Sequence, residues 1–330
     1  MILITGNAGF IGKYLTGVLL EKGETVRGID IRPRKDILFG FVQVDGNILE
    51  RSIVRQAMKD VDTMIHLAAE HKDFGVAESD YFRVNEQGTR AILEEASNAN
   101  IKKLIFYSSV AVYGAQSNTT EETPPVPNNH YGASKLAAER CVTAWAKENS
   151  SRTAIIIRPT VVFGPHSKAN IFRLIRQVCD GRFLMVGSGE NVKSIAYVRN
   201  LVDATIYLKD RCEAGLHIFN YADEPHMQTR ELVALIASQA GRKPQRLYVP
   251  LLLAEAGGYI FDIVGKLTGI DFPLTAARMK KFTVPTFHQA DKIRDFGFIP
   301  RYSIKEGLDE NIKWYKAGGA RADDESESSE

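Results

Sequence analysis

The sequence predicts an α/β fold, with a doubly wound parallel sheet and a smaller, discontinuous C-terminal domain. Short apolar runs alternate with longer amphipathic segments, and a glycine-rich turn follows the first of these runs. Alternation of strand and helix indicates parallel strands that are covered by helices on both faces. The length agrees, because 330 residues suffice for one large domain or two modest ones.

Six apolar runs are the expected strands of this sheet: Ile2–Ile4, Thr25–Ile29, Val61–Leu67, Lys103–Tyr107, Ala154–Ile157 and His217–Asn220. Helices are expected over Lys13–Lys22 and over Tyr81–Ala99, where apolar residues recur at helical spacing. Residues 165–189 and 228–287 carry most of the later prolines and are expected to be more irregular. We assign these two pieces to the smaller domain.

Composition excludes several classes of protein. Lys and Arg total 42 against 40 acidic residues, and a formal net charge of +2 lacks the basic excess of a dedicated nucleic-acid binder. Cys141, Cys179 and Cys212 form neither a disulfide framework nor a zinc-ligand pattern. No signal peptide is recognisable, and no apolar run reaches the roughly 18–20 residues of a membrane span. We expect a cytoplasmic protein with no metal, no nucleic-acid partner and no membrane insertion.

The glycine-rich turn TGNAGFIG, at residues 5–12, separates the first strand from the first helix. Gly6 permits a tight turn, Gly9 allows a pyrophosphate close to the backbone, and Gly12 allows close packing of helix and strand. The pyrophosphate would bind the amides at the positive end of the helix. This pattern predicts a dinucleotide-binding domain of the Rossmann type.

Asp30, at the end of the second strand, indicates which dinucleotide binds. A carboxylate at this place accepts hydrogen bonds from the ribose hydroxyls and repels the 2′-phosphate of NADP. Arg32 and Arg34 follow closely, and their guanidinium groups could instead hold that phosphate. We expect NAD, and NADP remains the alternative.

Tyr131 and Lys135 lie one helical turn apart, on the same face of an expected helix. An ordinary tyrosine, with a pKa of about 10, is a poor base at neutral pH. A neighbouring ammonium and the positive nicotinamide ring would stabilise the phenolate and lower that pKa. Ser108 and Ser109 follow another strand and could bind the same substrate oxygen. The set predicts proton transfer coupled to hydride transfer.

Together these residues resemble the extended short-chain dehydrogenase/reductase family, in its nucleotide-sugar epimerase and dehydratase group. The matching segments are Thr5–Gly12, His66–Ala69, Asn85 with Gly88 and Thr89, Ser108–Gly114, Tyr131 with Lys135, Arg158–Pro159 and Phe163–Pro165. Asp45 falls where the family uses an acid to hold the adenine amino group. The resemblance extends from Met1 to about Lys316.

The resemblance implies three sets of site residues. The catalytic residues are Ser109, Tyr131 and Lys135. The residues that contact NAD are Gly6, Ala8, Gly9, Phe10, Ile11, Gly12, Asp30, Ile31, Arg32, Asp45, Gly46, Leu67, Ala68, Ala69, Asn85, Ser108, Tyr131, Lys135 and Pro159. The residues that contact the substrate are Ser109, Val110, Tyr131, Asn170 and Lys193.

Departures from the family pattern reduce the number of reactions that this chain is expected to catalyse. Its 4,6-dehydratases carry an Asp-Glu pair directly after the active Ser or Thr, where this chain has Val110 and Ala111. Dehydration is therefore disfavoured, because neither side chain can transfer a proton. Lys193 stands where many epimerases place an Arg that binds the diphosphate, and Ser194 replaces a common Asp. These two departures keep a reductase in consideration.

We therefore expect an NAD-dependent nucleotide-sugar 4-epimerase that acts through a transient 4-keto intermediate, with a UDP-sugar as substrate. The alternatives are an NAD(P)-dependent 4-keto nucleotide-sugar reductase or dehydrogenase, a hydroxysteroid-type alcohol dehydrogenase, and a non-catalytic NAD-binding module. The resemblance also implies a homodimer formed by the helices at Tyr81–Ala99 and Tyr131–Lys147.

The expected domains follow from these assignments. Residues 1–165, with returning segments near 190–227, would form the Rossmann domain that binds NAD. Residues 166–189 and 228–316 would bind the substrate. Residues 317–330 are mostly Gly, Ser and acids and are expected to be a disordered tail, because they bury too little apolar surface to offset the entropy of ordering.

Overall fold

A computed structural model describes residues 1–32, 39–72, 75–243, 248–250 and 286–319. Arg34 and most of the predicted acidic tail lie outside these residues. The chain divides into two compact units. The first consists of Met1–Thr160, Val198–Ala222 and His288–Arg301, and the second of Val161–Tyr197, Asp223–Phe287 and Tyr302–Glu330.

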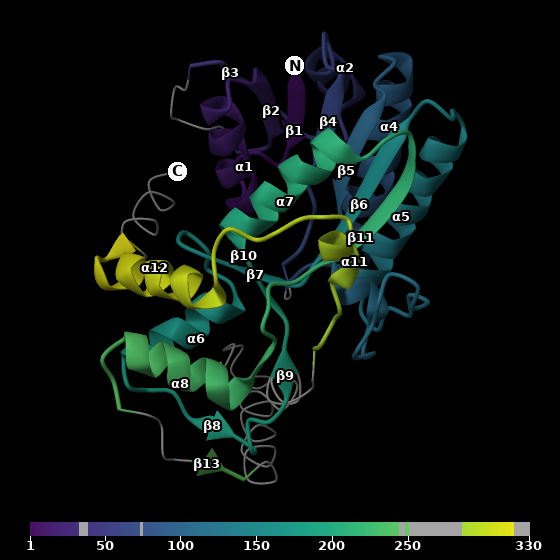
Figure 1. The fold of residues 1–330 in the computed structure, drawn as a ribbon. Coiled ribbons are helices and arrows are strands. Elements are labelled where there is room, and N and C mark those ends of the chain that lie inside the picture. Colours follow the sequence, from purple (N-terminus) through teal and green to yellow (C-terminus); the bar gives the residue numbers. More distant parts are fainter. Residues whose placement is uncertain (33–38, 73–74, 244–247, 251–285, 320–330) are drawn as a thin grey trace. The chain divides into compact units, whose positions relative to one another are not determined.

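A seven-stranded parallel sheet organises the first unit (Figure 1). Its strands are β1 (Ile2–Thr5), β2 (Val26–Asp30), β3 (Phe41–Asp45), β4 (Thr63–His66), β5 (Lys103–Tyr107), β6 (Thr153–Pro159) and β11 (Gly215–Tyr221). Their order in the sheet is β11-β6-β5-β4-β1-β2-β3. The strand order reverses between β1 and β4, which is where doubly wound folds bind ligands at the carboxyl ends of the strands. The predicted α/β Rossmann-type fold is confirmed.

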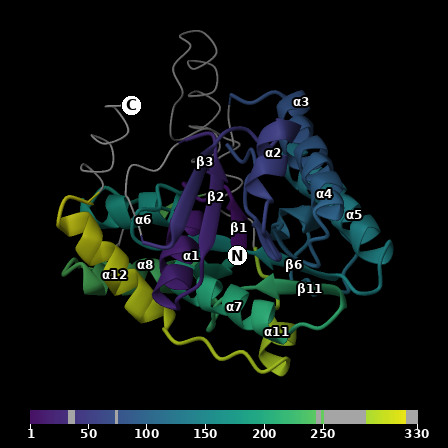
Figure 2. The same cartoon turned by 90° about the horizontal axis from the view of Figure 1, so that it is seen from above.

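Helices cover both faces of this sheet. The helices are α1 (Phe10–Glu21), α2 (Arg51–Ala57), α3 (Glu78–Tyr81), α4 (Gly88–Asn98), α5 (His130–Lys147), α7 (Val198–Arg211) and α11 (Asp291–Asp295), with a π-helical turn η1 (Phe82–Gln87) and a 3-10 turn η2 (Val110–Tyr113). Helices α1 and α7 pack side by side on one face, whereas α2, α4 and α5 lie on the other (Figures 1 and 2). Because the strands are parallel, each connection carries the chain from the carboxyl end of one strand back to the amino end of the next.

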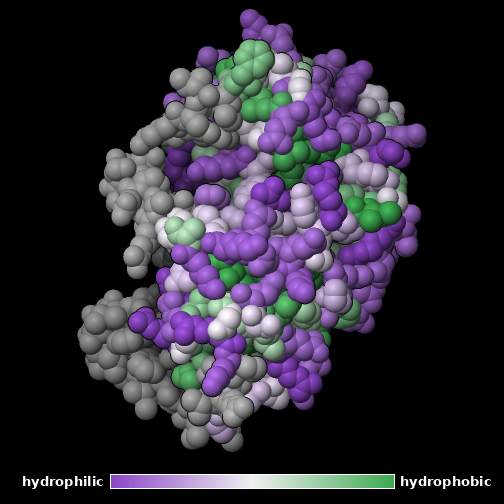
Figure 3. Space-filling view, turned by 60° about the vertical axis from the view of Figure 1, so that its left-hand side comes forward, coloured by the Kyte–Doolittle hydropathy of each residue, from purple (hydrophilic) through white to green (hydrophobic). Residues whose placement is uncertain are grey.

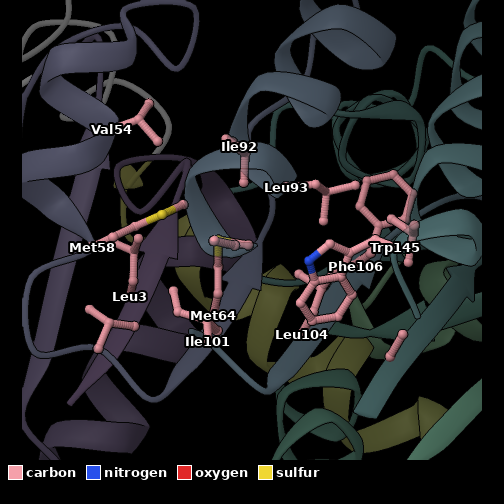
Figure 4. Close-up of a cluster of buried hydrophobic side chains, with 14 of the residues drawn as sticks. Leu3, Val54, Met58, Met64, Ile92, Leu93, Ile101, Leu104, Phe106 and Trp145 are labelled. Atoms are coloured by element: carbon pink, nitrogen blue, oxygen red, sulfur yellow. The ribbon is translucent and has the colours of Figure 1, made fainter. Parts of the chain in front are cut away.

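The main core lies between the sheet and the second group of helices. Met64 and Leu104 of the strands pack there with Ile92 of α4 and Trp145 of α5 (Figure 4). Each such side chain stabilises the fold by about 1.5–3 kcal/mol when it is fully buried. This packing fixes the orientation of α5, the helix that carries Tyr131 and Lys135.

Several elements differ from the sequence-based expectations. The edge strand β3 is an additional strand, and α1 begins at Phe10 rather than Lys13. The expected helix over Tyr81–Ala99 is a continuous run of α3, η1 and α4. Residues 165–189 and 228–287 are less irregular than expected, because their described parts contain two regular helices.

The second unit contains those helices. Its helices are α6 (Asn170–Cys179), α8 (Thr229–Gln239) and α12 (Ile304–Lys316), which pack on one another. Its strands form the pairs β7 (Val161–Phe163) with β10 (Ile195–Tyr197), β9 (Val192–Lys193) with β12 (Met227–Gln228), and β8 (Met185–Val186) with β13 (Tyr248–Val249). That this unit binds the substrate stays a prediction.

Among the described residues, exposed large apolar side chains come from separate parts of the chain, such as Phe39, Val126 and Ile299. Figure 3 shows a face on which hydrophilic residues predominate and hydrophobic residues are scattered. Within the described residues, the helices are too short or too polar to cross a bilayer.

Candidate active site

The turn between β1 and α1 is closely packed against the loop that follows β4. Gly6 has a φ of +74°, and a Cβ at this position would lie 2.7 Å from the amide nitrogen of Ala68. A Cβ at Gly12 would lie 2.3 Å from the carbonyl oxygen of Gly6. Both positions therefore require glycine, the first because of its positive φ and both because of close contact.

The start of α1 fits a pyrophosphate. Gly9 is the N-cap of the helix, and no side chain caps it. The first amides of a helix lack partners within the helix, and its dipole adds positive potential there. The residues present therefore suit the diphosphate of a dinucleotide at Gly9–Gly12.

Asp30 is held beside this turn. Its Oδ2 accepts a hydrogen bond from the amide of Ala8 at 3.0 Å, and its Oδ1 accepts one from the amide of Arg32 at 3.0 Å. Asp30 is in register with Asp45 on β3, and the amide of Gly46 donates to the Asp30 carbonyl at 2.9 Å. The carboxylate thus lies at the carboxyl edge of the sheet, as binding of a ribose requires. Ile31, next in sequence, is 69% exposed.

The segment after β4 lies next to the turn. The amide of Leu67 donates to the carbonyl of Thr5 at 3.0 Å, and the amide of Ala68 donates to the Thr5 hydroxyl at 3.2 Å. His66, at the end of β4, is buried. Its Nδ1 lies 2.6 Å from the hydroxyl oxygen of Thr5, and its Nε2 lies 2.9 Å from that of Thr89. Burial, aided by the charge of Lys135, lowers the pKa of His66 to about 3, so the ring is neutral.

Asn85 links this segment to the start of α5. Its amide nitrogen donates to the carbonyl of Glu70 and to the hydroxyl of Ser134, each at 2.9 Å. The Ser134 hydroxyl in turn donates to the carbonyl of Tyr131 at 2.8 Å. Asn85 therefore positions the first turn of α5, and its contact with NAD stays a prediction.

Tyr131 and Lys135 extend from that part of α5. Asn129 caps the helix by accepting a hydrogen bond from the amide of Gly132 at 2.8 Å. Lys135 is 3% exposed, and its Nζ donates to the carbonyl oxygen of Tyr107 at 2.7 Å. Burial lowers the pKa of Lys135 to about 7, and the negative charge of Glu139 opposes that shift.

The two serines leave the carboxyl end of β5, next to Tyr107. Ser108 is buried, and its Oγ has no hydrogen-bond partner within the described residues. Ser109 caps η2, its Oγ accepting a hydrogen bond from the amide of Ala111 at 3.1 Å. An oxygen that accepts in this way still carries its hydrogen, which it can donate to a substrate.

Close packing of α5 on η2 joins these groups into one site. A Cβ at Gly132 would lie 2.3 Å from the carbonyl oxygen of Ala111, so the first turn of α5 lies directly on η2. The structure therefore brings Tyr131 and Lys135 to the strand end that carries Ser109 and Val110. Pro159 ends the neighbouring strand β6.

Two of the predicted substrate residues lie in the second unit. Asn170 is the first residue of α6 and is exposed. Lys193 is half-buried on β9, where it pairs with Met227 of β12. Their contact with a substrate stays a prediction.

Sequence reasoning did not single out Glu139, and it placed Arg158 only within the matching segment Arg158–Pro159. Glu139 and Arg158 form a buried ion pair, in which Nη2 of Arg158 lies 2.6 Å from Oε2 of Glu139. The available signal was the spacing of Glu139, one helical turn after Lys135.

Comparison with known proteins identifies the class. The model of the NAD dependent epimerase/dehydratase family matches residues 2–222. The chain belongs to this family and is an NAD-dependent enzyme of the extended short-chain dehydrogenase/reductase type. The predicted family and the predicted NAD are confirmed.

Two individual relatives and one solved structure illustrate this similarity. The chain is 35% identical to the N-acetyl-alpha-D-glucosaminyl-diphospho-ditrans,octacis-undecaprenol 4-epimerase of Escherichia coli O157:H7, over 98% of this chain and 97% of that one. It is 31% identical to the UDP-glucose 4-epimerase of Vibrio cholerae, over 81% of this chain and 85% of the other. Among solved structures, MoeE5 in complex with UDP-glucuronic acid and NAD is 25% identical, with a TM-score of 0.75 over 96% of this chain and 99% of that one.

Proposed function

We propose that the chain is a 4-epimerase of sugars that are attached to a diphosphate, with a UDP-sugar as the first candidate substrate. One observation carries the proposal. Gly132, next to Tyr131, packs on η2, and Lys135 binds the last residue of β5, whereas Val110 and Ala111 provide no acid or base for elimination. The site can therefore oxidise and reduce a carbinol carbon without removing water.

Each side chain has a defined task in this reaction. Gly9–Gly12 and Asp30 would hold NAD, which accepts the C4 hydride of the sugar and later returns it. Tyr131 acts as a phenolate, which the Lys135 ammonium stabilises, and it takes the proton of the 4-hydroxyl to become a neutral phenol. Ser109 donates a hydrogen bond to the same oxygen. The 4-keto sugar then rotates in the site so that its opposite face receives the hydride. Tyr131 returns the proton to the oxygen at C4, and the reaction causes no net oxidation.

Two relatives favour different carriers of the sugar. The Vibrio cholerae protein is a UDP-glucose 4-epimerase, whereas the Escherichia coli protein, which matches more of the chain, is an epimerase of a sugar on diphospho-undecaprenol. Both substrates share a hexose on a diphosphate, and a cation such as Lys193 can neutralise either. A lipid-linked sugar is therefore the second candidate substrate.

The test is to incubate the purified protein with UDP-, GDP- and dTDP-hexoses and with polyprenyl-diphosphate N-acetylglucosamine. We expect inversion at C4 of one of them, seen by NMR or chromatography, without added reductant. Tyr131→Phe is the control and should abolish the inversion. Net formation or consumption of NADH with every substrate would instead establish a reductase or dehydrogenase.

We also propose that the chain forms a homodimer through α4 and α5. An open groove follows these two helices, and its lining includes Arg90, Leu93, Arg140, Cys141 and Trp145. A second copy would cover the exposed side chains of this groove, such as Arg90 and Arg140. Light scattering should give twice the mass of the chain, and Arg140→Glu should weaken the association relative to the exposed-site variant Lys59→Glu.

A further inference from the structure

A buried ion pair lies one helical turn behind the proposed proton-transfer site. Glu139 follows Lys135 by four residues on α5, and Arg158 lies on β6. The guanidinium binds the carboxylate through two parallel bonds, Nε to Oε1 at 2.8 Å and Nη2 to Oε2 at 2.6 Å. Both residues are almost completely buried, at 4% and 3% exposure.

Further hydrogen bonds hold this pair in one place. Nη1 of Arg158 donates to the hydroxyl of Tyr113 at 2.7 Å, and that hydroxyl donates to the side chain of Asn220 at 2.8 Å. The network therefore connects α5, β6, η2 and β11. Since all five donors of a guanidinium point in fixed directions, the carboxylate of Glu139 has little freedom to move relative to Lys135.

A buried ion pair is not explained by stability alone. Removing two charges from water costs more than their attraction returns in many proteins, and apolar side chains of similar size are often as stable. Burial alone would lower the pKa of Arg158, but the bonds and the charge of Glu139 outweigh it and raise that pKa above its ordinary value. The guanidinium thus remains charged at any pH at which the protein is folded.

The groups around Lys135 show which of them carries a negative charge that acts on its ammonium. His66 of β4 is neutral, and burial raises the pKa of Tyr107 on β5 well above its ordinary value. Arg158 carries the opposite charge and is bound to Glu139 through its guanidinium. Within the described residues, Glu139 is the group whose charge acts on Lys135 against the effect of burial.

We propose that Glu139, fixed in place by Arg158, is a positioning residue that keeps Lys135 in its ammonium form while Tyr131 transfers the proton. The inference rests on the proposed function, because it concerns the same Tyr131 and Lys135. It assigns no contact with substrate or cofactor to Glu139. Arg158 acts only through Glu139.

Its test measures the ionisation of Lys135 directly. Lysine labelled with ¹³C at Cε is introduced, the Lys135 signal is identified by its loss in Lys135→Met, and its chemical shift is followed against pH in the protein saturated with NAD and in the protein without it. Glu139→Gln should lower the apparent pKa of Lys135 by about one unit or more, the size expected for loss of a nearby opposite charge. Glu139→Asp, which keeps the charge, should shift it less.

A matched control is available on α4. Glu95 is also buried, at 2% exposure, and is held by Arg55 through two bonds of 2.9 and 3.1 Å. Glu95→Gln should leave the titration of Lys135 unchanged. If Glu139→Gln alone does not fold, the double variant Glu139→Gln/Arg158→Met removes both charges and leaves neither unpaired. It should shift the pKa of Lys135 in the same direction but by less, because loss of the positive Arg158 partly offsets loss of the negative Glu139.

Turnover gives the second readout. Activity requires the ammonium, so its alkaline limit should move to lower pH in Glu139→Gln together with the Lys135 signal. An unmoved Lys135 titration in a folded variant overturns the inference, and so does a moved titration with an unmoved pH profile. Analysis of the reaction product tests the proposed function separately, because the titration does not depend on which substrate is used.

Discussion

The Nζ atom of Lys135 lies 2.7 Å from the carbonyl oxygen of Tyr107, the last residue of β5. This bond joins the first half of α5 to the strand end from which Ser108 and Ser109 continue. The side chain is buried, so the bond forms away from competing water. Lys135 therefore has a fixed position at the carboxyl edge of the sheet.

Tyr131→Phe should reduce kcat by about 10²–10⁴-fold, because it removes the group that exchanges the proton. The structure should persist, since the hydroxyl alone is lost. The change is measured as product formed per enzyme, with NAD bound at saturation. Tyr81→Phe is the matched control, because this ring lies 6.4 Å from that of Tyr131 and carries the same group. A similar loss in both variants would contradict the role of Tyr131.

Much of the fold could be predicted because the strands of a buried parallel sheet are continuous apolar runs. Strand β5 begins at Lys103 and ends at Tyr107, as the sequence indicates. Strand β3, Phe41–Asp45, escaped prediction because it lies at the edge of the sheet, half-buried, and its apolar residues are separated by Gln43. Helix α6 was expected to be irregular, although five of its residues with helical spacing are buried: Ile171, Phe172, Leu174, Ile175 and Val178.

The site was predictable where its residues are neighbours in sequence. Tyr131 and Lys135 share one helix face, so their spacing alone indicates a joint role. The pair of Glu139 and Arg158 joins a helix to a strand, and the sequence contains nothing that fixes such a contact. The sequence likewise contains nothing that fixes the bonds of Asn85 to Glu70 and Ser134, and its contact with NAD stays a prediction.

The glycine-rich turn at residues 5–12 gives a second prediction, and another glycine of α1 serves as its control. Gly12→Ala should destabilise the protein and weaken NAD binding, because its Cβ would lie 2.3 Å from the carbonyl oxygen of Gly6. Gly17→Ala, on the same helix, meets no atom within 4 Å and should stabilise the protein by up to about 1 kcal/mol through helix propensity. Chemical unfolding with and without NAD measures both. Equal effects in the two variants would show that the turn is not close-packed.

Asp30→Asn should weaken NAD binding by about 10–100-fold, since charge-assisted hydrogen bonds are worth about 1.5–3 kcal/mol. It should also reduce discrimination against NADP, because the repulsion of the 2′-phosphate is lost. Titration calorimetry with both dinucleotides measures the two constants. Asp45→Asn serves as the comparison and should affect NAD binding less, because Asp45 is exposed whereas Asp30 is 8% exposed. An unchanged preference in Asp30→Asn would remove the basis for the choice of NAD.

The buried ring of His66 predicts how stability depends on pH. Its pKa is about 3 in the folded protein, against about 6.5 when unfolded. Between these two values the unfolded chain binds a proton that the folded protein does not, so the free energy of unfolding decreases as pH falls from 6.5 towards 3. The contribution of this one ring amounts to about 1.4 kcal/mol per pH unit.

A comparison of variants isolates that contribution from those of the carboxylates. His66→Gln cannot take up the proton, so the difference between its unfolding free energy and that of the wild type should shrink as pH falls from 6.5 towards 4. The hydrogen bonds to Thr5 and Thr89 make some loss of stability at pH 7 unavoidable, and that loss is the starting value of the difference. His130→Gln, at a side chain that is 59% exposed, is the comparison variant. A constant difference for His66→Gln would mean that the ring takes up its proton as readily in the folded protein as in the unfolded chain. The hydroxyls of Thr5 and Thr89 would then not hold the ring as a neutral group.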